Sequence, residues 1–165
     1  MINLDSLEKL QIFSKLNDEE LKKIQTICSE EEFQRDQSLF VEGDEAANLW
    51  VVSSGEVELR FEMPDKAQTS EKNAVSSHSE AIPESMVFGW SLFVPPYTMR
   101  LSAYCVSRKC TVIKIDGAAL NKLMDTDPKI GYKIMRYLVQ VVGHRFNQFQ
   151  NKMAKFVGIG LMNSW

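Results

Sequence analysis

The sequence predicts an α+β fold, mainly β, in which short antiparallel strands lie between a helical N-terminal segment and two C-terminal helices. Apolar residues recur at helical spacing before residue 30, alternate between glycine turns from 33 to 115, and return to helical spacing after Asp116. A chain of 165 residues is long enough for one well-buried core. We therefore expect a single domain over residues 1–165.

Residues 1–30 predict a helical cap. An apolar opening from Leu7 to Leu16 precedes Asn17, which is placed as an N-cap because acidic residues follow it. Leu21 and Ile24 then continue at helical spacing, as expected for a helix with one buried face.

Residues 31–115 predict the strands. Runs at 38–41, 49–52 and 57–61 are separated by turns at Gly43 and Gly55, and strand character resumes at 101–106 and 110–115. Residues 62–83 hold almost no large apolar side chain, so they predict a mobile surface loop.

Residues 117–155 predict two helices, and Asp127 with Pro128 marks the start of the second. That helix is roughly 40 Å long and carries apolar residues at spacings of three and four. The positions of this stripe are Ile130, Ile134, Leu138, Val141/Val142, Arg145/Phe146, Phe149 and Met153. The stripe either forms a homodimer through residues 128–155 or folds back over the strands of its own chain. The apolar tail at 156–165 is a candidate docking segment for an unidentified protein partner.

Composition excludes several classes of function. A net charge of −3 and a pI near 5.5 give no general attraction to nucleic acid or to an anionic membrane. No long apolar run or secretory signal is present, which predicts a cytoplasmic protein. Cys28, Cys105 and Cys110 form no CxxC pair and are expected to be buried thiols. Only His78 and His144 are available to a histidine metal site, so no metal is expected.

The order of the motifs resembles the cyclic-nucleotide-binding domain family, which includes the sensor half of catabolite-activator-type regulators. The similarity covers about Leu10 to Phe149 and is carried by the runs 39–44 (LFVEGD) and 49–59 (LWVVSSGEVEL), by Phe88-Gly89 and by the long last helix. The resemblance implies an antiparallel β-roll flanked by helices, and a regulatory domain that binds cyclic AMP or cyclic GMP and needs no cofactor. No reader helix follows the long helix in this sequence, so a DNA-binding domain is not expected.

The resemblance also implies a ligand site. In family members that bind a nucleotide, a cassette contains Phe-Gly-Glu and, further on, an arginine followed by a small residue and a hydroxyl residue. The candidate ligand-binding residues here are Phe88, Gly89, Trp90, Ser91, Arg100, Leu101 and Ser102. The cyclic phosphate would lie between the N–H groups after Gly89 and the guanidinium of Arg100.

Trp90 stands where the family has the glutamate that holds the ribose hydroxyl. An indole only donates a hydrogen bond, so nucleotide recognition is expected to be weakened or altered. Trp90 either stacks on a ligand or fills an emptied pocket, and Arg100 is either a ligand residue or an exposed strand-edge charge. His144 and Arg145 are either an exposed pair or groups that reach over the ligand or across a dimer.

An enzyme is not expected, because no nucleophile–base pair, paired carboxylates or phosphate loop with lysine is present. Two hypotheses remain for a non-catalytic domain. In the first, the chain is a sensor whose Gly89/Arg100 cassette binds a cyclic nucleotide or related anion. In the second, it is an interaction module that kept the fold and lost the ligand.

Overall fold

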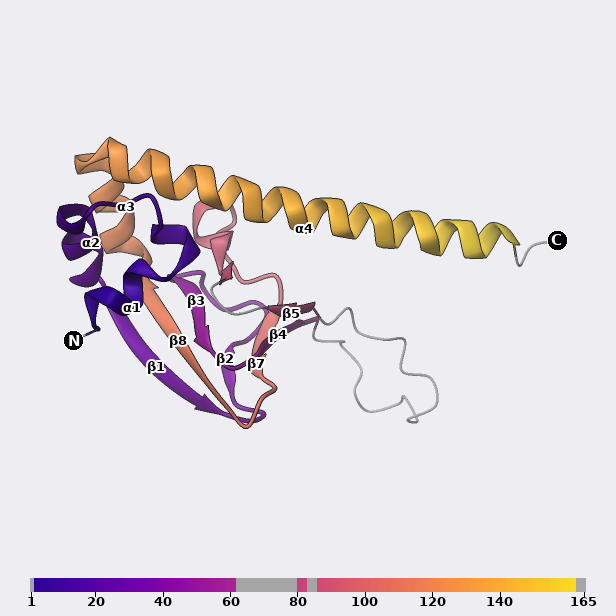
Figure 1. Ribbon diagram of the computed structural model, residues 1–165. Helices are drawn as coiled ribbons and strands as arrows, with labels where there is room; N and C mark the ends of the chain where they lie inside the picture. Colours follow the sequence, from indigo (N-terminus) through magenta and orange to yellow (C-terminus); the bar gives the residue numbers. More distant parts are fainter. Residues whose placement is uncertain (1, 62–79, 83–85, 163–165) are drawn as a thin grey trace.

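Two four-stranded antiparallel sheets form the centre of the computed structural model, which describes residues 2–61, 80–82 and 86–162 (Figure 1). The first sheet has the order β1-β8-β3-β6, and the second has the order β2-β7-β4-β5. The strands of the first are β1 (Cys28–Gln34), β8 (Lys109–Asp116), β3 (Asn48–Ser54) and β6 (Val87–Phe88). Those of the second are β2 (Ser38–Phe40), β7 (Ser102–Cys105), β4 (Val57–Arg60) and β5 (Glu80–Ile82). The predicted mainly β, α+β fold with flanking helices is confirmed.

An aromatic cluster joins the two sheets. Trp50 and Phe88 of the first sheet stack with ring centroids 6.5 Å apart, and Phe40 of the second sheet lies 5.9 Å from Phe88. Such aromatic pairs add to the free energy gained from burial. The cluster therefore fixes the position of Phe88, which directly precedes Gly89 in the predicted cassette.

The N-terminal cap consists of α1 (Leu4–Glu8), a short 3₁₀ helix η1 (Gln11–Phe13) and α2 (Asp18–Gln25). Asn17 caps α2 as predicted: its side chain accepts a hydrogen bond from the N–H of Glu20 at 2.9 Å, and the Glu20 carboxylate accepts one from the N–H of Asn17 at 2.9 Å. The buried Glu20 also accepts a hydrogen bond from the Lys133 ammonium at 2.6 Å, which ties α2 to α4.

The boundary between the cap and the strands differs from the prediction. The cap was expected to reach residue 30, but β1 already begins at Cys28 and pairs with β8 along its whole length. β1 lies at the edge of its sheet, where acidic side chains such as Glu30 stay in water. The charged residues of this run therefore led to the prediction of a longer helical cap in place of the start of β1.

The predicted loop at 62–83 also needs a correction. Residues 80–82 form β5, which pairs with β4 in the register Val57↔Ile82. Pairing satisfies backbone groups along an edge of β4 that would otherwise be open, which a polar composition does not reveal. Residues 62–79 and 83 of that predicted loop lie outside the described residues.

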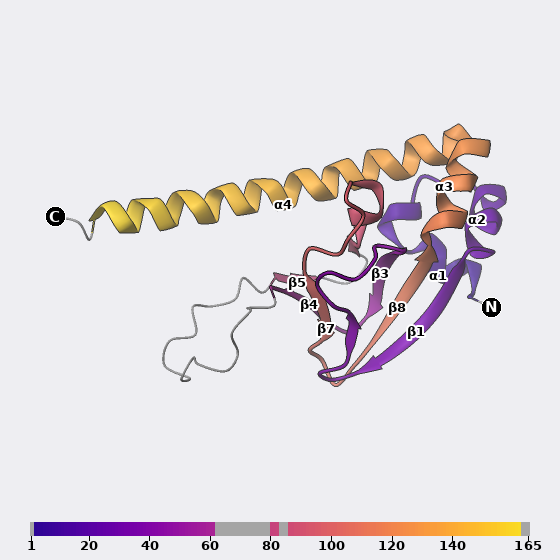
Figure 2. The same ribbon diagram turned by 180° about the vertical axis from the view of Figure 1, so that it is seen from behind.

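Two helices end the chain: α3 (Gly117–Thr126), capped by the Asp116 side chain, and α4 (Pro128–Met162). α4 begins at Pro128 as predicted but does not end near Lys155, because no proline interrupts the following residues. The predicted tail is thus mostly helix, and residues 163–165 lie outside the described part. The first turns of α4 pack on the body, and the helix then projects away from it (Figures 1 and 2). None of the described helices has an apolar stretch that could cross a membrane.

The cysteines carry no disulfide and are largely shielded from water. Burial raises the pKa of Cys28 to about 12. Burial, together with the neighbouring Cys105 thiol, raises the pKa of Cys110 to about 12. These two thiols therefore stay protonated and unreactive near neutral pH.

Candidate functional site

A left-handed turn at Gly89 begins the cassette. β6 ends at Phe88, Gly89 adopts a φ of 84°, and the short 3₁₀ helix η2 (Trp90–Phe93) follows. A Cβ at residue 89 would lie 2.8 Å from the carbonyl oxygen of Asn48 and 3.0 Å from the Trp50 ring. Glycine is therefore required here both by the backbone conformation and by the space available.

Two arginines meet at a small cavity beside this turn, which we call the cassette cavity. Its volume is about 40 Å³, and its lining residues are Phe40, Leu59, Gly89, Trp90, Ser91, Met99, Arg100, Leu101 and Arg145. Two guanidinium groups and no carboxylate are among these residues. The local charge therefore favours an anion, and the planar arginine fork suits phosphate or carboxylate oxygens.

Five of the seven predicted ligand residues line this cavity, namely Gly89, Trp90, Ser91, Arg100 and Leu101. Phe88 does not line it, because its fully buried ring belongs to the aromatic cluster beneath the turn. Ser102 does not line it either. Its buried hydroxyl accepts a hydrogen bond from the N–H of Glu42 at 2.8 Å, so it holds the turn after β2.

Four lining residues were not among the predicted ligand residues, and Arg145 is the charged one; the other three are Phe40, Leu59 and Met99. Arg145 lies on α4, and its Nη2 donates a hydrogen bond to the carbonyl oxygen of Val87 at 2.9 Å. The interpretation of His144 and Arg145 as an exposed pair is thus wrong for Arg145, whereas His144 is exposed. The sequence signal that could have identified Arg145 is its place beside Phe146 in the apolar stripe of the helix, where a cation is unusual. Through Arg145, α4 is anchored to the strand that leads into the cassette.

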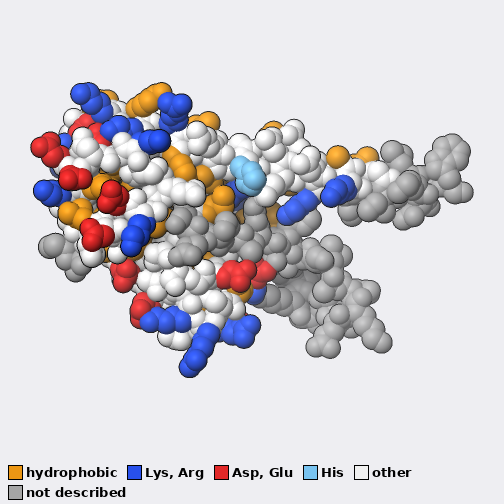
Figure 3. Space-filling model, in the orientation of Figure 1, with side chains coloured by type: hydrophobic (Ala, Val, Ile, Leu, Met, Phe, Trp, Pro, Cys, Tyr) orange, Lys and Arg blue, Asp and Glu red, His pale blue; other side chains and the backbone are white. Residues whose placement is uncertain are grey.

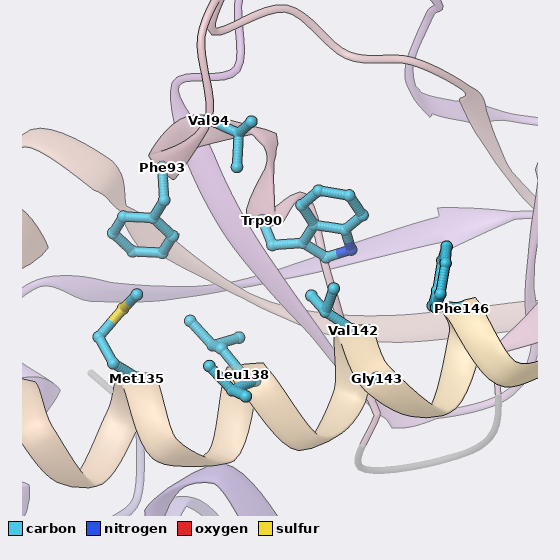
Figure 4. A pocket seen from close by; sticks show the side chains of 9 residues that line it. Trp90, Phe93, Val94, Met135, Leu138, Val142, Gly143 and Phe146 are labelled. Atoms are coloured by element: carbon cyan, nitrogen blue, oxygen red, sulfur yellow. The ribbon is translucent and has the colours of Figure 1, made fainter.

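A second and larger cavity, which we call the apolar pocket, lies between the cassette and α4. Its volume is about 420 Å³, and its lining residues are Trp90, Phe93, Val94, Met135, Leu138, Val139, Val142, Gly143 and Phe146. Figure 4 shows Phe93 and Trp90 on one side and Met135, Leu138 and Val142 on the other. Trp90 lines both cavities, so the two lie next to each other.

The projecting part of α4 carries apolar and basic side chains together (Figure 3). Phe146, Phe149, Met153 and Val157 are all about half exposed. Residues 128–162 contain no aspartate or glutamate, although the whole chain has a net charge of −3. The helix is therefore locally cationic.

No group of three or more metal-ligating side chains comes together in the described part of the chain. The charged groups with clearly shifted pKa values are ion-paired between helices. The Lys133 ammonium lowers the pKa of Glu20 through a hydrogen bond, and Lys23 lowers the pKa of Asp127 in the same way. Both pairs fasten α2 to the start of α4, so they are structural.

Comparisons with known proteins give matches in structure. No protein-family model and no curated sequence matches the chain. A protein of Geobacter metallireducens GS-15 named as cyclic-nucleotide-binding matches with a TM-score of 0.72 and 26% identity, over 88% of this chain and 99% of the other. The regulatory domain of Toxoplasma gondii PKA, solved with cAMP, matches with a TM-score of 0.58 and 17% identity, over 76% of this chain and 45% of the other. The Thermus thermophilus Catabolite Activator Protein matches with a TM-score of 0.63 and 14% identity, over 86% of this chain and 62% of the other.

Proposed function

We propose that this chain, which has the fold of the cyclic-nucleotide-binding domains, is a regulatory sensor that binds a cyclic nucleotide or related anion in the cassette cavity and signals through α4. The observation that carries the proposal is the convergence of Arg100 and Arg145 on a cavity that has no acidic lining residue. Charge-assisted hydrogen bonds from these guanidinium groups would contribute about 1.5–3 kcal/mol each when shielded from water.

The size of the cavity suggests how binding would produce a signal. About 40 Å³ accommodates a group of phosphate size, whereas sites for whole small molecules are usually about 300–1,000 Å³. A base and ribose would therefore enter only if Trp90 or Arg145 moved. Because Arg145 belongs to α4, such a ligand would favour a different position of the helix, which is a population shift between two states.

Trp90 sets the expected selectivity. It lies at the cavity where the family's ribose-binding glutamate is expected, and it contains no acceptor for a ribose hydroxyl. A phosphate that is held without a ribose contact would bind about ten- to a hundredfold more weakly. We therefore expect modest affinity and weak discrimination between cyclic nucleotides.

The test is a thermal-shift titration with cyclic AMP, cyclic GMP and cyclic dinucleotides at millimolar concentration. A ligand with a Kd of about 10 μM, added at about 1 mM, should raise the free energy of unfolding by about 2.7 kcal/mol. This gain raises the melting temperature by roughly 5–10 °C. Arg100→Ala should abolish the shift. Arg108→Ala is the matched control, because Arg108 is an exposed arginine in the turn between β7 and β8. An unchanged melting temperature with every ligand would reject nucleotide binding.

The second candidate is an interaction module that has kept the fold without a ligand. The specific observation in its favour is the small volume of the cassette cavity, with Trp90 as one of its walls. An aromatic side chain that replaces a ligand contact fills space and stabilises the fold. In this case Arg100→Ala would leave all properties of the protein almost unchanged, because Arg100 is exposed.

The output of either module would pass through α4. Its exposed apolar residues follow each other at spacings of four, seven, three and four; they are Met135, Val139, Phe146, Phe149 and Met153. This spacing is the heptad pattern of a coiled coil, in which two helices cover each other's stripe. We therefore propose that the chain forms a homodimer through α4, including residues 128–155.

A further inference from the structure

The apolar pocket has walls from two separate elements. Phe93 and Trp90 come from η2, and Met135, Leu138 and Val142 come from α4 and face them across the gap (Figure 4). Leu138 is only 3% exposed and lies at the bottom, whereas Val139 and Phe146 at the rim are 66% and 57% exposed. The pocket therefore extends inward from the helix surface and is more than a row of exposed side chains.

The lining chemistry excludes charged ligands. None of the lining residues is charged, and the indole N–H of Trp90 is the one polar group among their side chains. A charge moved into such surroundings without a partner would lose its hydration with nothing to replace it. Three aromatic rings, those of Trp90, Phe93 and Phe146, favour an aromatic or flat hydrocarbon guest through offset or edge-to-face contacts.

The space available matches a small molecule. A volume of about 420 Å³ falls within the usual range of roughly 300–1,000 Å³ for small-molecule sites. Gly143 lines this space, and a Cβ at that position would meet no atom within 4 Å. Glycine is unfavourable inside a helix relative to alanine, and no crowding by the chain itself requires one here.

We infer that the apolar pocket is a second ligand site, which binds a small, neutral, largely aromatic or aliphatic molecule. The inference goes beyond the proposed function, because it uses neither a phosphate nor Arg100. A partner's α4 would cover the outward stripe that Met135, Val139 and Phe146 belong to, so in a dimer these lining residues would contact the partner as well as the guest. The floor at Leu138 lies below that stripe, between the helix and the cassette, and stays available to a guest.

The test uses N-phenyl-1-naphthylamine, a neutral aromatic probe that becomes fluorescent in apolar surroundings. We expect saturable binding in the micromolar range with one probe per chain. Arg100→Ala should leave this binding unchanged, so failure of the pocket and failure of the cassette are distinguishable.

Gly143→Leu is the decisive variant. It adds a branched side chain at a lining position where an added Cβ meets no atom, and it should weaken probe binding by about tenfold or more while the protein keeps its circular dichroism spectrum. Gly158→Leu is the matched control, because this α4 glycine also has no atom within 4 Å of an added Cβ and lies outside the pocket. It should bind the probe like the wild type.

Val94→Asp provides an independent test that does not depend on the helix. Val94 is a half-exposed rim residue, so a carboxylate there should leave folding intact and still weaken binding of a neutral guest. Equal binding by the wild type and both pocket variants would overturn the inference, as would the lack of saturable binding. Loss of the signal in proportion to dimer formation would also overturn it, because the occupant would then be a second copy.

Discussion

Removal of the Arg145 guanidinium should loosen α4 from the cassette. Arg145→Met keeps most of the aliphatic stem and deletes the hydrogen bond of 2.9 Å to the Val87 carbonyl. A hydrogen bond from a charged donor contributes about 1.5–3 kcal/mol, and the partial burial of this residue places the loss at the lower end, about 1.5 kcal/mol. For a chain of this size, that loss lowers the melting temperature by roughly 3–6 °C.

The assay combines thermal denaturation with hydrogen exchange of the native protein. Exchange should become faster at residues 87–93 and around residue 145, because both ends of the contact lose support. Arg136→Met is the control, since Arg136 is an exposed arginine of the same helix whose guanidinium reaches only as far as Tyr132, one turn away. The reasoning is refuted if Arg145→Met and Arg136→Met give the same melting temperature and the same exchange at residue 87.

Three further predictions concern the turn at Gly89, the dependence of stability on acidic pH, and the dimer. Gly89→Ala should lower the free energy of unfolding by about 1–3 kcal/mol in urea denaturation, because its φ is 84° and the added Cβ would clash with the Asn48 carbonyl. The Lys133 hydrogen bond holds the pKa of Glu20 below the ordinary value of 4.5. This pair therefore stabilises the fold above pH 4.5, and its contribution is lost as the pH falls through the lowered pKa. Glu20→Gln should remove that part of the acid dependence of stability. Phe146→Glu should yield a monomer of about 19 kDa by light scattering at tens of micromolar, where the wild type is expected to be a dimer.

Each of these three predictions has a result that contradicts it. Gly89→Ala with wild-type stability would mean that the turn relaxes to another conformation. If Glu20→Gln unfolds in acid at the same pH as the wild type, the Glu20–Lys133 pair does not contribute to acid stability. A wild-type mass of about 19 kDa at tens of micromolar would reject the dimer before any variant is made.

Local signals in the sequence were sufficient for much of the fold. Asn17 and Pro128 mark helix starts through the capping and ring geometry of single residues, and Gly89 marks a turn through its backbone freedom. These features depend on a few neighbouring residues. They could therefore be predicted without knowledge of the tertiary structure.

The features that the sequence did not reveal depend on distant partners. β1 carries an acidic run that looks unlike a strand until β8 pairs with it, and β5 exists through its pairing with β4. The contact between Arg145 and Val87 joins residues that are 58 positions apart. Of the candidate site, the cassette lining was largely predicted, but the apolar pocket was not, because its walls meet only when α4 packs on η2.

The most direct test of the central claim, that an anion in the cassette changes the position of α4, is hydrogen exchange of the intact chain with and without millimolar cyclic AMP. We expect slower exchange at residues 89–93, where the phosphate would bind, and altered exchange on α4 around residue 145. Arg100→Ala should remove both effects. Protection at 89–93 without any change on α4 would contradict signalling through the helix, and no change in either segment would contradict binding itself.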